Sequence, residues 1–566
     1  MIKPSDGATN VPSNLTIERR SPERVMRLER MGSAHPTRLS FLRTLLRRVN
    51  DENWRFEKAA WDINANGVGH AVYKAIGPVR TYSLIVFAHD LPDDQRSDRV
   101  IATAWDATFT LFDGEPTKKD IDRLAENVPL QEAGRIDQTE LCMGRANRSV
   151  RLFDHVIDHL SRGLQPDMRE LESVGYLMRT TAVYGSGKFG AVDFSLITSR
   201  PELRPCFQVE MLAVWLFRSF TVDIINHMAR ISGGDKMVPL GAQEMNALGV
   251  GNSTGLGMAP FLVRHPMLIN NWLLAREEAL VRVRNRPNLT LQDHSNLKDE
   301  LKRAQRNARN WISEHPIQLQ KIADLQTDLG KVEALLCQDL IQNAQPWNHV
   351  WIWAETNLTL EGQEAFLAIL LECNGPLVDG LADCMDANEH LGTVIDGSIP
   401  LFKIIHMIEH QYAWALNVDY NLNAASARFW YVSEEKLEPR LGERFEEPGQ
   451  ELELPLDIGR MVALFYSALC EFDPAAVLAD FLRSQPTHRY IARRVLMMNN
   501  HPYGEVQDNL IDQSMMPIDL LRCKLSFFGA THFDPRSDRW VRISLFKGQD
   551  YPNFDHQVTV SGSHNA

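Results

Sequence analysis

Two glycine-rich segments carry the residue types best suited to binding an anion. The first runs from Gly249 to Pro260, and the second, Tyr184–Gly190, holds Lys188 among three glycines. Glycine lets backbone N–H groups converge on an anion because no Cβ blocks the approach. The first segment ends in Met258-Ala259-Pro260, and proline suits the first turn of a helix, where free N–H groups favour a negative charge. The two segments therefore predict a site for a small anionic molecule.

The ligand expected at this site bears a phosphate or a carboxylate group, with Lys188 as its mobile and catalytic cation. Residues that we expect to contact it are Arg179, Gly185, Gly187, Gly251, Asn252, Ser253, Thr254 and Gly255. Neither segment has the glycine spacing of a Walker A loop or of a Rossmann fingerprint, so the pattern does not indicate a nucleotide. In the alternative interpretation both segments are turns where helices pack closely, and the sequence leaves this open.

His406, Glu409 and His410 form a second candidate site. The pattern H-x-x-E-H places two histidines one helical turn apart, which is how inverted zincins hold zinc and use the glutamate as a base. It predicts His406 and His410 as metal ligands, a divalent metal such as zinc as cofactor, and all three residues as catalytic groups. The flanking residues 411–414 do not resemble that family, so a hydrogen-bonded histidine pair at a helix contact is the alternative.

Two further clusters favour structural roles. His155 and His159 have the i, i+4 spacing of a metal pair, but aspartates flank them beside an apolar stripe, which is typical of a helix rim. The stretch 488–494 contains three arginines and precedes Asn499 and Asn500. Such a cluster binds carboxylates or phosphates in some proteins, but here we expect it to pair with acidic residues of the same chain.

Composition excludes several classes of protein. The chain has 566 residues, 44% of them hydrophobic and 23% charged, which is typical of a globular protein with a large core. Its net charge is -13, although residues 1–50 hold ten Lys/Arg against four Asp/Glu. An acidic body lacks the clustered cations that bind nucleic acid, so we expect no nucleic-acid partner.

Seven scattered cysteines without a C-x-x-C pair indicate reduced thiols, and residues 1–7 lack the apolar run of a signal peptide. We therefore expect a cytoplasmic protein. The most apolar segment, 211–231, contains Arg218, Asp223 and Arg230, whose burial in lipid costs several kcal/mol. This segment predicts a buried helix and no membrane partner.

Hydrophobic periodicity predicts a mainly α protein of the α+β class. Alternation over residues 69–76, 81–89 and 100–112, joined by short links, predicts a small antiparallel sheet from the N-terminal region. Most of the chain beyond residue 117 is predicted to be helical, including residues 166–180 and 207–232. The stretch 293–343 is predicted to form a helical hairpin broken at Pro316. Apolar runs at 525–528 and 540–546 predict strands that could extend the sheet.

The expected organisation has six parts: a flexible basic arm (1–36), a helix plus β-meander (37–116), a helical body (117–430), an acidic exposed connection (431–456), helices plus C-terminal strands (457–551) and a tail (552–566). The function indicated is a soluble enzyme that binds a small anionic substrate at the two glycine-rich segments. A metal-dependent hydrolase and a non-enzymatic helical scaffold or interaction protein remain as alternatives. The sequence does not determine the oligomeric state, and a homo-oligomer is one alternative.

Overall fold

The structure is a computed structural model, and it describes the chain in the following residues: 17–92, 104–129, 137–180, 199–252, 263, 265–311, 316–338, 345–386, 394–418, 420, 428–433, 438–443, 455–507, 517–530, 532–533, 543–552 and 554–555.

A ten-stranded sheet is the central element of the fold. Its strands are β1 (Arg55–Ile63), β2 (Gly69–Ile76), β3 (Thr81–Ala88), β4 (Ala107–Asp113), β5 (Glu140–Arg148), β6 (Tyr176–Thr180), β7 (Gly249–Asn252), β10 (His532–Phe533), β11 (Ile543–Leu545) and β12 (Phe554–Asp555). They lie in the order β10-β11-β7-β6-β5-β4-β3-β2-β1-β12. Strands β1 to β6 pair antiparallel in chain order, whereas β6 with β7 and β1 with β12 pair in parallel.

The prediction of a small antiparallel sheet is wrong, because the sheet is large and mixed. Six of its strands lie beyond residue 117, and three of these, β5, β6 and β7, lie where we expected helices and loops. Strands β6 and β7 are only five and four residues long, and all of their residues are buried. A short strand that is buried throughout shows no alternation of polar and apolar residues, so its sequence pattern cannot be told from that of a buried helix.

Residues 166–180, which we expected as one helix, divide at Gly175. Helix α6 (Met168–Val174) ends there, and Gly175 has φ +76°, the left-handed conformation that closes many helices. Strand β6 begins at the next residue. The helical period of α6 and the apolar run of β6 are continuous in the sequence, so the glycine is the feature that separates them.

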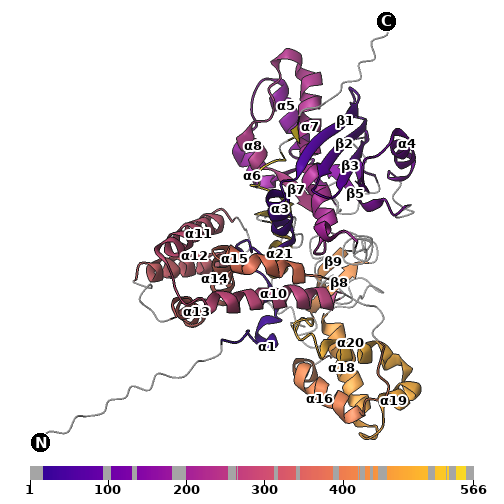
Figure 1. Ribbon diagram of the computed structural model, residues 1–566, viewed down its shortest axis with the longest axis vertical. Coiled ribbons are helices and arrows are strands. Elements are labelled where there is room, and N and C mark those ends of the chain that lie inside the picture. Colours follow the sequence, from indigo (N-terminus) through magenta and orange to yellow (C-terminus); the bar gives the residue numbers. More distant parts are fainter. Residues whose placement is uncertain are drawn as a thin grey trace, which may run out of the picture.

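Helix α7 (Gln208–Gly233) covers one face of the sheet. It contacts strands β2 to β7 and also joins β6 to β7, so that these two strands run parallel (Figure 1). Helices α3 (Phe41–Asp51) and α5 (Phe153–Ser161) pack against α7. Helix α4 (Lys118–Asn127) lies on the opposite face, where its Leu124 packs with Ile85 and Phe87 of β3.

Most of the remaining helices form two groups, which lie below the sheet in Figure 1. The first consists of α10 (Pro266–Arg284), α11 (Leu291–Arg309), α12 (Pro316–Leu336), α13 (Pro346–Asn357), α14 (Leu360–Glu372) and α15 (Gly375–Val378), and it shares one hydrophobic core with the sheet. The second consists of α16 (Leu401–Gln411), α17 (Ala413–Leu416), α18 (Pro455–Cys470), α19 (Leu478–Ser484) and α20 (Arg489–Met498), and it has a core of its own. Shorter elements are α8 (Ala242–Asn246) and the hairpin of β8 (Arg428–Ser433) with β9 (Glu438–Glu443).

Both ends of the described chain enter the main core. Residues 17–36 include the short helices α1 (Pro22–Val25) and α2 (Leu28–Met31), and Val25 and Met31 are fully buried. The predicted strand 525–528 is wrong, because these residues end helix α21 (Pro517–Phe528). The ring of Phe527 contacts those of Phe41 and Trp272, so α21 is fixed by contacts distant in sequence. The predicted division of the chain into six parts stays a prediction.

Among the described helices, none is by itself long and apolar enough to cross a membrane. One bent pair, Leu360–Glu372 with Gly375–Cys384, passes that test by length and composition.

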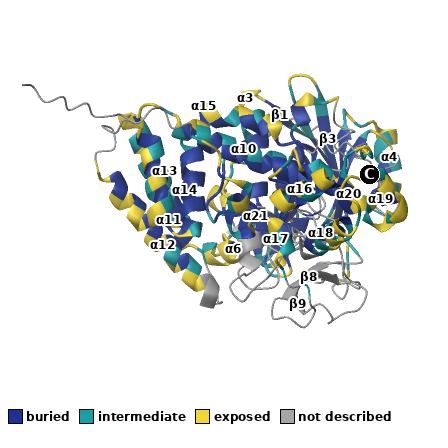
Figure 2. Cartoon of the chain, turned by 90° about the horizontal axis from the view of Figure 1, so that it is seen from below, coloured by how far each residue is buried: buried dark blue, intermediate teal, exposed yellow. Residues whose placement is uncertain are grey.

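A buried carboxylate fixes the start of α14. Asp328 of α12 accepts hydrogen bonds from the backbone N–H of Thr359 at 2.7 Å and from its hydroxyl at 2.6 Å. An anion is favoured at a helix N-terminus because unpaired N–H groups point toward it. The carboxylate fits against Gly362, where a Cβ would come 2.3 Å from the Asp328 Oδ2 atom. Figure 2 shows that α14, which starts here, is largely buried.

We expect Gly362→Ala to lower the free energy of unfolding by about 1–3 kcal/mol, because the new methyl group displaces Asp328 from Thr359. Urea denaturation checks this value. Gly330→Ala on α12 is the matched control, since nothing lies within 4 Å of its Cβ position; it should raise stability by up to about 1 kcal/mol. Equal effects of the two substitutions would contradict the proposed role of Asp328.

Candidate functional site

The two glycine-rich segments are connected to neighbouring parallel strands. The first four residues of the segment Gly249–Pro260 form β7, and the segment Tyr184–Gly190 comes after β6 in the chain. In the pairing of β6 with β7, Arg179 lies opposite Gly251 and Thr180 lies opposite Asn252. The last residues of the two strands are therefore neighbours in the sheet. Ligands of α/β proteins commonly bind beyond the carboxyl ends of parallel strands, where such connections meet. Residues 181–198 and 253–262, with Gly185, Gly187, Lys188, Ser253, Thr254 and Gly255 among them, lie outside the described residues.

The sheet has an apolar face and a polar face near these strand ends. Phe109 of β4 stacks on Phe217 of α7 with ring centroids 4.6 Å apart, so Phe109 faces the helix. Successive side chains in a strand point to opposite faces, which turns Thr108 away from α7. Thr108 lies opposite Arg145 of β5 in the register of the strands. The side chain of Arg145 therefore also lies on the face away from α7.

Four residues form what we call the polar patch: Thr108, Arg145, Asn147 and Arg179. Asn147 follows Arg145 by two residues and lies opposite Arg179, so all four share the face away from α7. Thr108, Asn147 and Arg179 are buried and Arg145 is half-buried. Polar side chains on a buried sheet face gain nothing from apolar packing, which makes this patch a candidate for binding.

A brace of residues 104–106 lies beside the patch and is held by Asn147. The Asn147 side chain accepts a hydrogen bond from the Asp106 N–H at 3.0 Å and donates one to the Ala104 carbonyl at 3.4 Å. The Asp106 carboxylate in turn accepts from the N–H of Arg148 at 2.9 Å. The three contacts fasten the chain before β4 to the end of β5. They also fix Trp105, which lies between the two anchored residues.

Arg145 is a cation without a counter-charge in the described part of the chain. Its guanidinium carbon lies 4.2 Å from the centroid of the Trp105 ring, and no described side chain or carbonyl accepts a hydrogen bond from the guanidinium. Burial lowers the pKa of Arg145, and no described carboxylate opposes that shift. A partly desolvated charge in this state favours the binding of an anion, because the anion compensates for the lost interactions with water.

His89 adds a titratable group at the rim of the patch. Its Nε2 atom lies 3.0 Å from the Thr108 hydroxyl oxygen. Burial lowers the pKa of His89 and outweighs Asp106, whose negative charge raises it. The imidazole is therefore neutral at pH 7 and able to accept a proton.

Arg218 fixes the strand that carries Gly251. This buried arginine of α7 donates to the Leu248 carbonyl at 3.0 and 3.2 Å, directly before β7. It also donates to the carbonyls of Gln549 at 2.8 Å and Asp550 at 3.1 Å, after β11. Burial lowers the pKa of Arg218, but its guanidinium is satisfied by these carbonyls. Its role is therefore to hold β7 and the segment after β11 against α7.

The other described residues predicted at the glycine-rich site have identifiable positions. Arg179 belongs to the polar patch, and Asn252 is buried at the end of β7. A Cβ at Gly251 would come 2.7 Å from the Tyr176 ring, so the ring explains the need for glycine there. Sequence reasoning missed Arg145 and Trp105. The sequence does contain a signal for Arg145, because it is a charged residue inside the apolar run Leu141–Ala146. Burying a charge is costly unless it has a partner.

The histidine site on α16 stays apart from the patch. His406, Glu409 and His410 are exposed, and Glu409 accepts a hydrogen bond from the Tyr466 hydroxyl at 2.8 Å. Within the residues that the structure describes, no group of three or more His, Cys, Asp or Glu is placed to hold a metal ion. The zinc site therefore stays a prediction without a third ligand. The rings of His155 and His159 lie 4.2 Å apart, and His155 contacts Glu170 at 2.6 Å.

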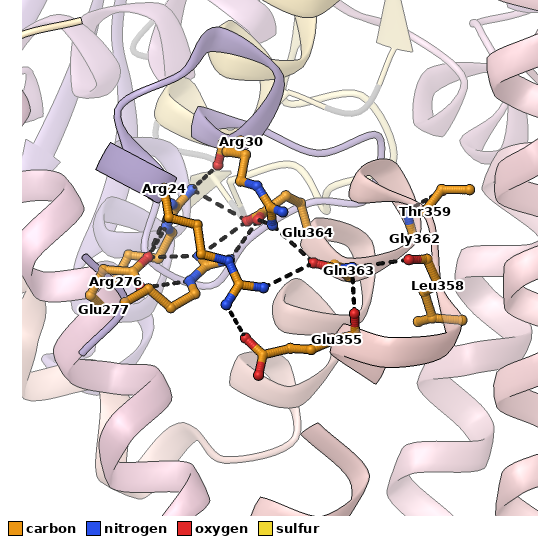
Figure 3. Close-up of polar contacts among 11 residues, drawn as sticks. Arg24, Arg30, Arg276, Glu277, Glu355, Leu358, Thr359, Gly362, Gln363 and Glu364 are labelled. Atoms are coloured by element: carbon orange, nitrogen blue, oxygen red, sulfur yellow. Dashed lines mark hydrogen bonds and ion pairs between the residues drawn. The ribbon is translucent and has the colours of Figure 1, made fainter. Parts of the chain in front are cut away.

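A cluster of buried charges lies elsewhere and has a structural role (Figure 3). Arg20 pairs with Glu277 of α10 at 2.7 Å and with Glu364 of α14 at 2.6 Å. Arg276 also donates to Glu277 at 3.0 Å, and Arg30 to Glu364 at 3.3 Å. The acidic partners raise the pKa of Arg20 well above its usual range despite the opposing effect of burial. Because each charge has a partner, this arginine–glutamate cluster docks the N-terminal segment and leaves no group free for a ligand.

Comparison of the chain with protein-family models, with curated protein sequences and with solved structures gives no match.

We expect Arg20→Met to lower the free energy of unfolding by about 3–5 kcal/mol, because it leaves buried carboxylates short of a partner. Arg24→Met is the matched control. Arg24 pairs with Glu355, and the two side chains are 36% and 23% exposed, so its loss should cost at most about 1 kcal/mol. Chemical denaturation of both variants measures the difference. Similar losses for the two variants would show that burial of the cluster does not matter.

Proposed function

We propose that the protein binds a small oxyanion, a carboxylate or a phosphate group, at Arg145 on the polar patch. The observation that carries the proposal is a half-buried guanidinium with a lowered pKa and no anionic partner among the described residues. An arginine presents its N–H groups as a planar fork that matches two oxygens of a carboxylate or phosphate. A bound oxyanion supplies the charge and the hydrogen-bond acceptors that the site lacks.

The position of the patch supports the same function. Arg145 and Arg179 lie on one sheet face, diagonally across the β5–β6 pair, and Arg179 directly precedes the end of β6. Neighbouring positions of this kind are about 7–8 Å apart between Cα atoms, which one small molecule can span. The rest of the first glycine-rich segment, residues 253–260, is proposed to donate backbone N–H groups to the ligand, and the second segment is proposed to contribute backbone N–H groups and the Lys188 ammonium. His89, which lies beside Thr108 and is neutral at pH 7, is proposed to accept a proton there.

Arg145→Gln should weaken the binding of inorganic phosphate or acetate about 10- to 100-fold, because it removes the charged N–H fork but keeps a polar side chain of similar length. Isothermal titration calorimetry on the full chain measures both dissociation constants. Arg169→Gln removes the same charge from an arginine side chain that is 90% exposed on α6, and it should change neither constant.

Lys188→Ala in the same titrations tests the proposed contribution of the second glycine-rich segment and should also raise both constants. Unchanged binding in the Arg145 variant, with circular dichroism like that of the wild type, would contradict the proposed function. Unchanged binding in the Lys188 variant alone would remove only that segment from the site.

A further inference from the structure

Trp105 restricts how an anion approaches Arg145. With the guanidinium carbon 4.2 Å from the ring centroid, the indole covers one side of the guanidinium. The ring face attracts the cation through its quadrupole and holds it against the ring. Both residues are half-buried, so part of the pair is exposed to solvent. An anion therefore meets Arg145 at the edge of the guanidinium, where its N–H groups point, or on the uncovered side.

The backbone that carries the ring is anchored beside Arg145. The neighbours of Trp105 in the chain, Ala104 and Asp106, are both hydrogen-bonded to the side chain of Asn147. Asn147 is buried in β5, two residues after Arg145, so the backbone of Trp105 and the guanidinium are held by the same strand. The brace thus places Trp105 next to Arg145, and the contact of the ring with the guanidinium restrains the direction of the Arg145 fork.

A fixed fork distinguishes between classes of anion. Carboxylate and phosphate groups present two oxygens at the spacing of the arginine N–H groups and form two parallel hydrogen bonds. A halide ion accepts at a single point and is attracted mainly by charge. Holding the fork in one orientation therefore favours two-oxygen anions. The arginine side chain is already ordered before they bind, so binding loses less conformational entropy. A freely rotating arginine loses this advantage but keeps its charge.

We propose that Trp105 is the specificity-determining residue of this site, because it orients the Arg145 fork so that the site selects carboxylates and phosphates over halides. This inference rests on the proposed function of Arg145 as an anion receptor. Trp105 acts through Arg145 as a positioning residue.

The test measures the binding of inorganic phosphate, acetate and chloride to the full chain by calorimetry and by competition. Trp105→Leu should raise the dissociation constants for phosphate and acetate about 5- to 30-fold, because it removes the aromatic face that orients the guanidinium. Affinity for chloride should stay within about twofold, since the charge of Arg145 is retained. Trp105→Phe keeps an aromatic face and should restore most of the selectivity. In the Arg145→Gln background, Trp105→Leu should have no further effect, as expected for two residues that act as one unit.

The outcomes separate this inference from the function on which it rests. If Arg145→Gln weakens phosphate binding but Trp105→Leu does not, or if Trp105→Leu weakens phosphate and chloride equally, only the role of Trp105 is overturned. If Arg145→Gln leaves phosphate binding unchanged, the proposed function fails as well. Should Trp105→Leu unfold, Trp105→Met against Trp105→Phe decides the same question. Loss of selectivity in the Met variant alone supports the inference, and equal selectivity in both overturns it.

Discussion

Burial of helix α7 against one face of the ten-stranded sheet is the interaction on which the rest of the structure depends. The helix is apolar on nearly all sides and lies between the sheet and helices α3 and α5. The helix buries the apolar side chains of that face; Phe109, for example, stacks on Phe217. Because it also connects β6 to β7, it makes these strands parallel and places Thr180 beside Asn252 at their carboxyl ends. The alternate residues of each strand point to the other face of the sheet, and on β5 and β6 these include the polar patch.

Among the described residues, the buried arginines Arg20 and Arg218 differ from the half-buried Arg145. Arg20, with Glu277 and Glu364, and Arg218, with backbone carbonyls, are fully satisfied and hold distant segments together. Removing a partner from such a group leaves an unpaired charge, so these clusters are costly to alter and do not suit a ligand that comes and goes. Arg145 differs because its stabilising contact is an aromatic ring, which leaves its N–H groups available. This difference, and not the density of charge, separates the candidate site from the structural clusters.

The sequence predicted what depends on local periodicity and missed what depends on distant contacts. The strand expected at 69–76 coincides with β2, and the helix expected at 207–232 closely matches α7, because both have long, regular patterns. Strands β6 and β7 lack such a pattern, and their pairing is set by a helix between them that spans many residues. Arg179 was expected at a site and lies in the polar patch. Arg145 was missed because a single arginine in a strand looks like a surface residue until the opposite strands are known.

The most direct test of the central claim is the chemical reactivity of individual arginines. Phenylglyoxal modification of the native protein, followed by peptide mass spectrometry, reports which guanidinium groups are accessible and unpaired. The account predicts that Arg145 is modified readily, that Arg20 and Arg276 are not, and that saturating inorganic phosphate protects Arg145 but not the exposed Arg169. A native protein in which Arg145 resists modification, or in which phosphate protects Arg145 no better than Arg169, would contradict the claim that Arg145 is an uncompensated anion receptor.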